Sequence, residues 1–331
     1  MDPNRPRVGL ALGGAAARSV FYIGVLEVLS EAGVPIDFIS ASSSGTIVAS
    51  AFACGKLNEI KEVIFNLDRG SLMSLLTKNR VGGGLYSLDK VELVLRKIIG
   101  GKNFEEVRPG LAFAAVDLRD SSLTVLAMGD IARAARISCT VPGLFEPISW
   151  GNKVLVDGGL LSVIPGNIAR DAGMDLVIGV NTRSTKFIFK PHQMKLRLLY
   201  RSIKRVLLLN HAETLWDRIS KTLFNSDWFS VYAESENPEF EFPGLWTILG
   251  KSIDIAIEAE TRGAKEGNFY GCDHLITLDT KRFGIVDLSQ TQNLYSIGRE
   301  TAESQLPVIF DLIEKKRLKL IKPEIERIYA S

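Results

Sequence analysis

Two consecutive strand–turn–helix units at the start of the chain constrain its fold more than any other feature. Residues 8–12 form a short apolar run, a turn rich in glycine and alanine follows, and residues 20–32 carry apolar side chains at helical spacing up to Gly33. The layout then repeats, with an apolar run over residues 36–40, a serine-rich turn and an apolar helix over residues 46–54. Strands that alternate with helices typically form a parallel sheet, because each helix carries the chain back to the same edge.

Further apolar runs continue this alternation along the chain and define the fold class. The strand candidates cover residues 111–116, 123–127, 153–156, 176–180 and 275–278. The pattern predicts an α/β protein with three layers, α/β/α, around a mostly parallel central sheet. We expect residues 1–185 to form the core, residues 186–270 a helical insert, and residues 271–331 the last strand and a C-terminal helical tail.

Composition excludes several classes of protein. The 331 residues are 46% hydrophobic and 24% charged, which is typical of a globular chain with a large core. The formal net charge of +2 gives no overall attraction to nucleic acid, so we expect no nucleic-acid partner. Three widely separated cysteines and three histidines indicate neither a zinc site nor a disulfide framework. Without a signal peptide or an apolar run of membrane-spanning length, the sequence predicts a cytoplasmic protein.

The predicted insert combines positive charge with aromatic residues. Residues 186–205 hold seven lysines and arginines, no acidic residue occurs between Leu176 and Ala212, and apolar residues are interleaved at roughly helical spacing. Trp216, Trp228 and Trp246 follow. One interpretation is a helix that docks on an anionic membrane surface, with the tryptophans at headgroup level. The alternative is an ordinary solvated helix face.

Ser43 is the first candidate for chemistry. It lies between a predicted strand and a predicted helix, with the small residues Ala41 and Gly45 two positions before and after it. This arrangement resembles the strained turn that raises a nucleophilic hydroxyl above a sheet. The alternative is that Ser42, Ser43 or Ser44 caps the helix that follows. The pattern alone leaves both interpretations open.

A nucleophilic serine also needs a base and hydrogen-bond donors for an oxyanion. The three histidines, at positions 192, 211 and 274, lie outside the expected strand-end loops, which disfavours a Ser-His-Asp triad. Asp157 is the better base, because it ends an apolar strand and precedes Gly158 and Gly159, although an Asp-Gly-Gly is also an ordinary turn. The donors would come from residues 13–16, whose alternative role is to cradle a phosphate. The dinucleotide-binding glycine pattern is not satisfied there.

Taken together in their order, these blocks resemble the patatin-like phospholipase family, in its bacterial branch. The matching blocks are residues 10–19 and 23–26, residues 41–45, residues 115–118, residues 134–147, and residues 157–160 with Pro165. They extend over roughly the first half of the chain. Their joint occurrence in the family's order is much more specific than any single motif.

The resemblance implies a serine acyl hydrolase that uses a Ser-Asp dyad, with no metal or organic cofactor and a lipid or other acyl ester as substrate. By position, Ser43 would be the nucleophile on an elbow flanked by Ala41 and Gly45, and Asp157 the base in an Asp-Gly-Gly motif with Gly158 and Gly159. The implied oxyanion hole comprises Gly13, Gly14, Ala15, Ala16 and Ser44, with Gly14 and Ala15 as the main donors and Arg18 supporting the loop. Other hypotheses are a non-catalytic membrane-associated regulator with the same fold and an acyltransferase.

This chain departs from the family at four positions where the family usually has glycine. Ala15, Ala16, Ser19 and Ala41 stand where the family usually has glycine. An alanine keeps its amide hydrogen, so the donors survive at negative φ. At positive φ each substitution would cost about 1 to 2 kcal/mol.

Overall fold

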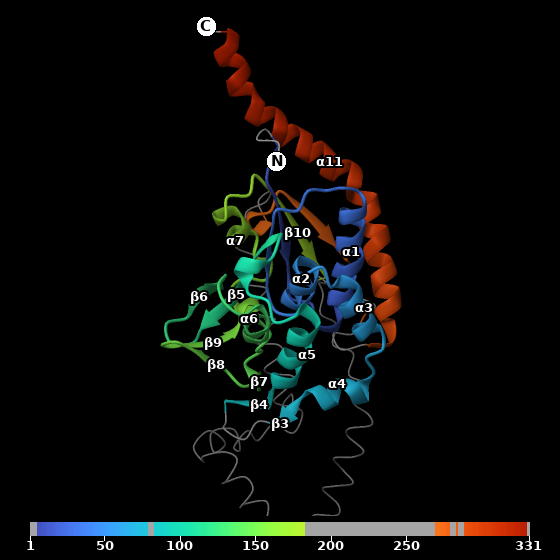
Figure 1. The fold of residues 1–331 in the computed structure, drawn as a ribbon, viewed down its shortest axis with the longest axis vertical. Coiled ribbons are helices and arrows are strands. Elements are labelled where there is room, and N and C mark those ends of the chain that lie inside the picture. The colour runs from blue at the N-terminus through green and yellow to red at the C-terminus, as the bar shows by residue number, and fades with distance from the viewer. Residues whose placement is uncertain (1–4, 79–82, 183–268, 279–282, 284–287, 330–331) are drawn as a thin grey trace, which may run out of the picture. The chain divides into compact units, whose positions relative to one another are not determined.

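The computed structural model describes residues 5–78, 83–182, 269–278, 283 and 288–329, which all belong to one compact unit (Figure 1). The predicted insert, residues 186–270, lies almost entirely outside the described residues, including the basic segment 186–205 and the three tryptophans after it. Among the described helices, none is both long enough and apolar enough to cross a membrane.

Helices and strands alternate along the chain as the sequence predicts, and most boundaries lie within two residues of the expected positions. The strands are β1 Val8–Leu12, β2 Phe38–Ala41, β3 Thr77–Lys78, β4 Gly84–Ser87, β5 Gly110–Asp117, β6 Ser122–Leu126, β7 Gly143–Phe145, β8 Ile148–Trp150, β9 Lys153–Asp157, β10 Leu176–Asn181 and β11 His274–Thr277. The α-helices are α1 Val20–Glu31, α2 Gly45–Ala53, α3 Leu57–Phe65, α4 Arg69–Leu75, α5 Asp89–Ile99, α6 Ile131–Ser138, α7 Gly166–Asp171 and α11 Thr291–Tyr329. The last of these confirms the helical tail.

The central sheet has a parallel half and an antiparallel half. Its order is β11-β10-β1-β2-β5-β9-β8, with β6 also paired to β5. The strands from β11 to β5 are parallel, as predicted, whereas β6, β8 and β9 join through antiparallel pairs. The sheet is therefore mixed, with four parallel pairings from β11 to β5, as predicted, and three antiparallel pairings at this edge. The links β5–β6 and β8–β9 are tight turns, and a parallel pair needs a crossover of a dozen or more residues.

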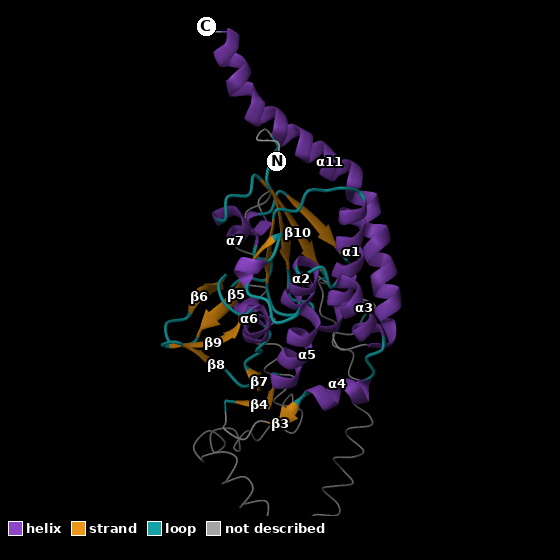
Figure 2. Ribbon diagram, in the orientation of Figure 1, coloured by secondary structure: helices purple, strands orange, loops and turns teal. Residues whose placement is uncertain are grey.

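Helices cover both faces of this sheet and complete the three predicted layers (Figure 2). On one face, Val8, Leu10 and Leu12 of β1 pack in the main core with α1, α2, α5, α6 and α11. On the other face, Ala11 of β1 packs in a smaller core with Ala169 of α7. Because alternate residues of a strand point to opposite faces, the continuous apolar run of β1 serves both cores.

Helix α11 lies along α1 on the main-core face (Figure 1). Two glycines allow the close crossing. A Cβ on Gly24 would stand 2.3 Å from the carbonyl oxygen of Tyr295, and one on Gly298 would stand 2.3 Å from that of Phe21. The C-terminal tail is therefore part of the core packing of the described unit.

Candidate active site

Ser43 lies on a strained turn between β2 and α2. Its φ is +51°, a left-handed conformation that costs a residue with a side chain about 1 to 2 kcal/mol. The turn is close to the loop after β1, since the amide of Ser42 donates to the carbonyl of Leu12 at 3.0 Å. Gly45 begins α2 against the same loop, and a Cβ there would stand 2.7 Å from the carbonyl oxygen of Gly13. These features resemble those of the strand-to-helix elbow that carries the nucleophile in some hydrolases.

The sheet register brings Asp157 level with Ser43. Ala41 of β2 pairs with Phe113 of β5, so Ser43 lies two residues further along, at the height of Ala115. Asp157 of β9 pairs with Ala115 from the other side of β5. The two side chains therefore meet across β5, although they come from strands that run in opposite directions.

The hydroxyl of Ser43 donates a hydrogen bond to the carboxylate of Asp157, with 2.7 Å between Oγ and Oδ2. Asp157 is only 5% exposed, whereas Ser43 is partly accessible. Burial raises the pKa of Asp157 to about 6, and the hydrogen bonds from Ser43 and from the Gly159 amide offset part of that effect. The group is thus charged above about pH 6 and is a stronger base than an exposed aspartate.

The two glycines after Asp157 have separate structural roles. The amide of Gly159 donates to Oδ1 of Asp157 at 2.7 Å, which leaves Oδ2 for Ser43. Gly158 passes so close to β5 that a Cβ would stand 2.2 Å from the carbonyl oxygen of Ala114. The Asp-Gly-Gly segment therefore fixes the orientation of the carboxylate and is more than an ordinary turn.

The loop after β1 lies beside the Ser43 side chain. A Cβ on Gly14 would be 3.0 Å from Cβ of Ser43 and 3.6 Å from its Oγ. The amide of Gly13 donates to Val180 in the sheet at 3.1 Å, and the amide of Ala15 donates to Oγ of Ser44 at 3.0 Å. Within the described part of the chain, the amides of Gly14 and Ser44 donate to no other group. The Ala16 amide also has no acceptor among the described residues, but Gly14 and Ser44 adjoin the serine, Gly14 through contact with the Ser43 side chain and Ser44 as the next residue in the chain.

The substitutions of the usual glycines differ in their backbone cost. Ala16 has a φ of +49°, whereas Ala15 has −143° and Ser19 −59°. Ala41 is a buried residue of β2. Only Ala16 therefore carries left-handed strain. The amide of Arg18 supports the same loop by donating to the carbonyl of Ala15 at 3.1 Å.

Replacing Ala16 with glycine is expected to raise the free energy of unfolding by about 0.5 to 1 kcal/mol, because relief of the left-handed strain exceeds the added flexibility of the unfolded chain. Ala15→Gly is the matched control, since its negative φ offers no strain to relieve, and it should leave stability unchanged or lower it. Urea unfolding of both variants measures the difference. Equal effects would contradict a strained Ala16.

The three serines of the elbow do not cap α2. Within the described ranges, no side chain makes an N-terminal capping bond to this helix. Ser43 donates to Asp157, Ser44 accepts from Ala15, and the buried Oγ of Ser42 has no hydrogen-bond partner among the described residues. The capping interpretation is therefore wrong. His274 lies in β11, where its ring contacts Gln305 at 3.0 Å, and the other two histidines lie outside the described residues.

The sequence analysis did not predict the residues that hydrogen-bond to the backbone of Ser43 and Asp157. Oγ of Ser138 accepts from the amide of Ser43 at 2.9 Å, and Oγ1 of Thr46 donates to the carbonyl of Ser43 at 2.6 Å. The carbonyl of Thr140 accepts from the amide of Asp157 at 2.8 Å. Ser138 and Thr140 belong to one of the family-like blocks, and that membership is the only signal in the sequence that singles them out.

The fold and this site define an α/β protein with a serine on a strand-to-helix elbow and a buried aspartate as its hydrogen-bond partner. Among the described residues, no group of three or more His, Cys, Asp or Glu side chains could hold a metal ion. Residues 10–170 match the sequence model of the patatin-like phospholipases, and these residues contain Ser43, Asp157 and the groups that hydrogen-bond to them. Over this segment the chain is similar to the patatin-like phospholipase family.

Several named proteins are similar to this chain in sequence. Proteins named uncharacterized NTE family protein, from Mycobacterium tuberculosis and Mycobacterium bovis, are 26% identical over 91% of this chain and 91% of their own. Lysophospholipase NTE1 of Candida albicans is 20% identical, and the match covers 94% of this chain and 21% of that protein. The mouse patatin-like phospholipase domain-containing protein 6 is 25% identical over 54% of this chain and 14% of its own.

Proposed function

We propose that the protein is a serine acyl hydrolase, a lipolytic esterase of the phospholipase A or lysophospholipase type, with Ser43 as nucleophile and Asp157 as its base. The observation that carries the proposal is the 2.7 Å hydrogen bond between Oγ of Ser43 and Oδ2 of the buried Asp157. A nucleophile and base within hydrogen-bond reach, with the base oriented by a third group, is the arrangement that covalent catalysis needs. Here the orienting group is the amide of Gly159.

The proposed reaction has two halves. Oγ of Ser43 attacks the ester carbonyl while its proton passes to Asp157, which gives a tetrahedral intermediate. The C–O bond to the alcohol then breaks, the alcohol leaves with the proton from Asp157, and an acyl-Ser43 ester remains. In the second half, water attacks this ester while Asp157 accepts the proton and returns it to Oγ, and the carboxylic acid is released.

The oxyanion of each tetrahedral intermediate needs donors close to Ser43. We assign this role to the amides of Gly14 and Ser44, because they have no acceptor among the described residues and are adjacent to the serine, whereas the Gly13 amide is engaged in the sheet. The Ala15 amide is engaged by the Ser44 hydroxyl, so its role is to hold the loop against the elbow. Two such donors in a site of low dielectric stabilise the developing charge strongly.

The names of relatives guide the proposed substrate class. The yeast relative is named a lysophospholipase and the mouse relative a patatin-like phospholipase domain-containing protein. We therefore propose carboxylic esters of phospholipids or lysophospholipids as substrates, with simple acyl esters as surrogates. Contact with an anionic membrane through residues 186–205 stays a prediction, which co-sedimentation with anionic and neutral vesicles tests.

Labelling with a fluorophosphonate probe tests the nucleophile directly. We expect Oγ of Ser43 to displace fluoride and form a phosphonyl ester that mass spectrometry maps to this residue, and we expect Ser43→Ala to lose the adduct. Ser42→Ala is the matched control, because the Ser42 hydroxyl is next to Ser43 in the chain and has no hydrogen-bond partner among the residues that the structure describes. This variant should be labelled like the wild type. Absence of an adduct on folded wild-type protein would contradict the proposal and favour a non-catalytic regulator.

A further inference from the structure

The C-terminal end of α6 contacts the backbone at both members of the Ser43–Asp157 pair. Ser138, the last residue of α6, is fully buried. Its Oγ accepts from the amide of Ser43 at 2.9 Å and donates to the carbonyl of Ala114 in β5 at 2.7 Å. The hydroxyl therefore connects the elbow to the central strand that lies between β2 and β9.

The residues that follow Ser138 hold the other side of the pair. The carbonyl of Thr140 accepts from the amide of Asp157 at 2.8 Å, and Oγ1 of Thr140 donates to the carbonyl of Arg136 at 3.0 Å. One turn of chain thus fixes the backbone positions of Ser43 and Asp157. Displacement of this turn would change the distance between the serine hydroxyl and the carboxylate.

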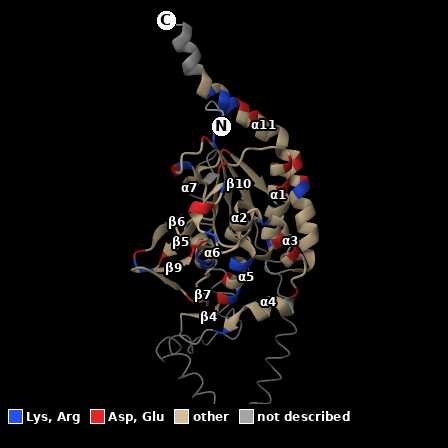
Figure 3. Ribbon diagram, viewed as in Figure 1, with Lys and Arg blue, Asp and Glu red and all other residues tan. Residues whose placement is uncertain are grey.

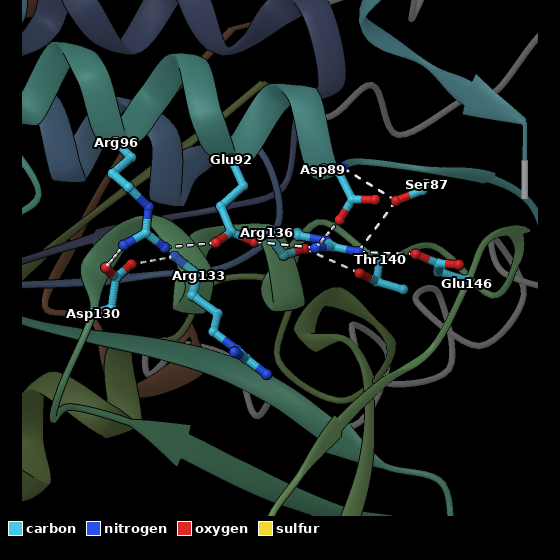
Figure 4. A network of polar contacts seen from close by, with 9 residues as sticks. All are labelled: Ser87, Asp89, Glu92, Arg96, Asp130, Arg133, Arg136, Thr140 and Glu146. Carbon is cyan, nitrogen blue, oxygen red and sulfur yellow. Dashed lines mark hydrogen bonds and ion pairs between the residues drawn. The ribbon is translucent and has the colours of Figure 1, made fainter.

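A network of ion pairs anchors this end of α6 to α5 (Figure 4). The guanidinium of Arg136 contacts Glu92 at 3.1 Å, Glu146 at 2.9 Å and Asp89, and it is only 15% exposed. Glu92 also pairs with Arg96 at 2.6 Å. Charged residues of both signs occur together on α5 (Figure 3). Because several partners hold one guanidinium, the network resists rotation of α6.

The elbow needs such support because its backbone is strained. A residue with φ of +51° persists only where the surrounding structure fixes it. The amide of Ser43 also needs an acceptor, since a buried donor without a partner is costly. A hydroxyl can accept from Ser43 and donate to Ala114 at once. An alanine at position 138 can do neither, whereas a threonine keeps both bonds.

We propose that Ser138 is a positioning residue that sets the Ser43 hydroxyl at hydrogen-bond distance from Asp157 through the relay Ser43 N–H to Ser138 O–H to Ala114 C=O. This inference rests on the proposed function. It adds a role for α6, which supports the backbone of the proposed nucleophile. Loss of the Ser138 hydroxyl should slow the attack of Ser43 on the ester. It should not change how tightly the ester binds.

Ser138→Ala is expected to lower kcat for p-nitrophenyl butyrate by about 10- to 100-fold with KM unchanged, because small misplacements of a nucleophile have effects of this size. The acid limb of the pH–rate profile should also shift to higher pH. The Ser43 hydrogen bond lowers the pKa of Asp157, so loosening it raises that pKa further above the ordinary value. The other titratable group felt at this site is the Cys139 thiol, whose pKa burial raises to about 12, so it stays neutral across the profile.

Two further variants separate positioning from general loss of structure. Ser138→Thr retains the relay and should recover most of the wild-type kcat and the wild-type acid limb. Ser50→Ala is the matched control, because Ser50 is a fully buried serine of α2 that donates only to the carbonyl of Thr46. It should leave kcat and the acid limb unchanged. Rates are read at the isosbestic wavelength of p-nitrophenol, and thermal melting confirms that each variant is folded.

The outcomes distinguish this inference from the proposed function. If wild-type protein is labelled at Ser43 but Ser138→Ala keeps the wild-type kcat and acid limb, Ser138 has no positioning role. If Ser138→Ala and Ser50→Ala lose the same fraction of kcat, the effect is structural and the inference is wrong. If folded wild-type protein forms no adduct, the proposed function itself fails, and the positioning role fails with it.

Discussion

Replacing Asp157 with asparagine is expected to lower kcat for ester hydrolysis by about 100- to 10,000-fold while the protein stays folded. The amide of asparagine cannot accept the proton of Ser43 at any pH near neutrality. It retains an oxygen that can accept from the Gly159 amide, so the turn after β9 should survive. Steady-state kinetics with a soluble acyl ester, together with circular dichroism, measure both parts of this prediction.

Asp117→Asn provides the matched control for this variant. Asp117 is also a buried aspartate, 3% exposed, in the neighbouring strand β5, and its Oδ1 accepts from the backbone amides of Arg119 and Val154. It makes no contact with Ser43, so its asparagine variant should keep near-wild-type kcat. Equal activity of wild type and Asp157→Asn would exclude Asp157 as the base.

Replacing Gly45 with alanine is expected to have the second largest effect. The added Cβ would stand 2.7 Å from the carbonyl oxygen of Gly13 and 2.8 Å from that of Leu12, and both atoms are backbone that cannot rotate away. The elbow and the loop after β1 must therefore separate. We expect a loss of about 1 to 3 kcal/mol in the free energy of unfolding and a kcat about 100-fold lower, because Ser43 moves relative to Gly14.

Gly70→Ala is the control for this substitution. Gly70 lies in α4, and a Cβ there would meet only the Asp68 carboxylate, at the ordinary distance of 3.5 Å. Alanine favours a helix over glycine by roughly 0.5 to 1 kcal/mol, so this variant should be at least as stable as the wild type and fully active. Urea unfolding and the esterase assay compare the two variants. A Gly45→Ala protein that matches Gly70→Ala in both would show that the close approach is not needed.

Three glycines near Ser43 and Asp157 are expected to affect both stability and activity. Gly45, Gly158 and Gly14 each occupy a place where a Cβ would meet a neighbouring backbone or the Ser43 side chain at 3.0 Å or less. These contacts hold the elbow, the Asp157 turn and the loop after β1 together. We therefore expect substitutions at these glycines to reduce activity even where the protein still folds.

The sequence by itself determined the strand–turn–helix order, the parallel part of the sheet, and the candidacy of Ser43 and Asp157. Periodicity in the apolar residues specifies which segments are strands and helices, because each has a fixed side-chain repeat. Small residues around Ser43 and after Asp157 marked the two tight turns. These signals are local, since each depends only on residues adjacent in the chain.

Only the tertiary structure decided how the two candidates meet. The sequence placed Asp157 at the end of a strand, but it did not show that this strand, β9, runs antiparallel to β5. Asp157 reaches Ser43 because its register with Ala115 matches the height of the elbow. The sequence also did not predict three other features of the site. These are the support from Ser138 and Thr140, the hydrogen bond of the Ala15 amide and the left-handed backbone of Ala16. They depend on contacts between segments far apart in the chain, and local residue patterns do not encode such distances.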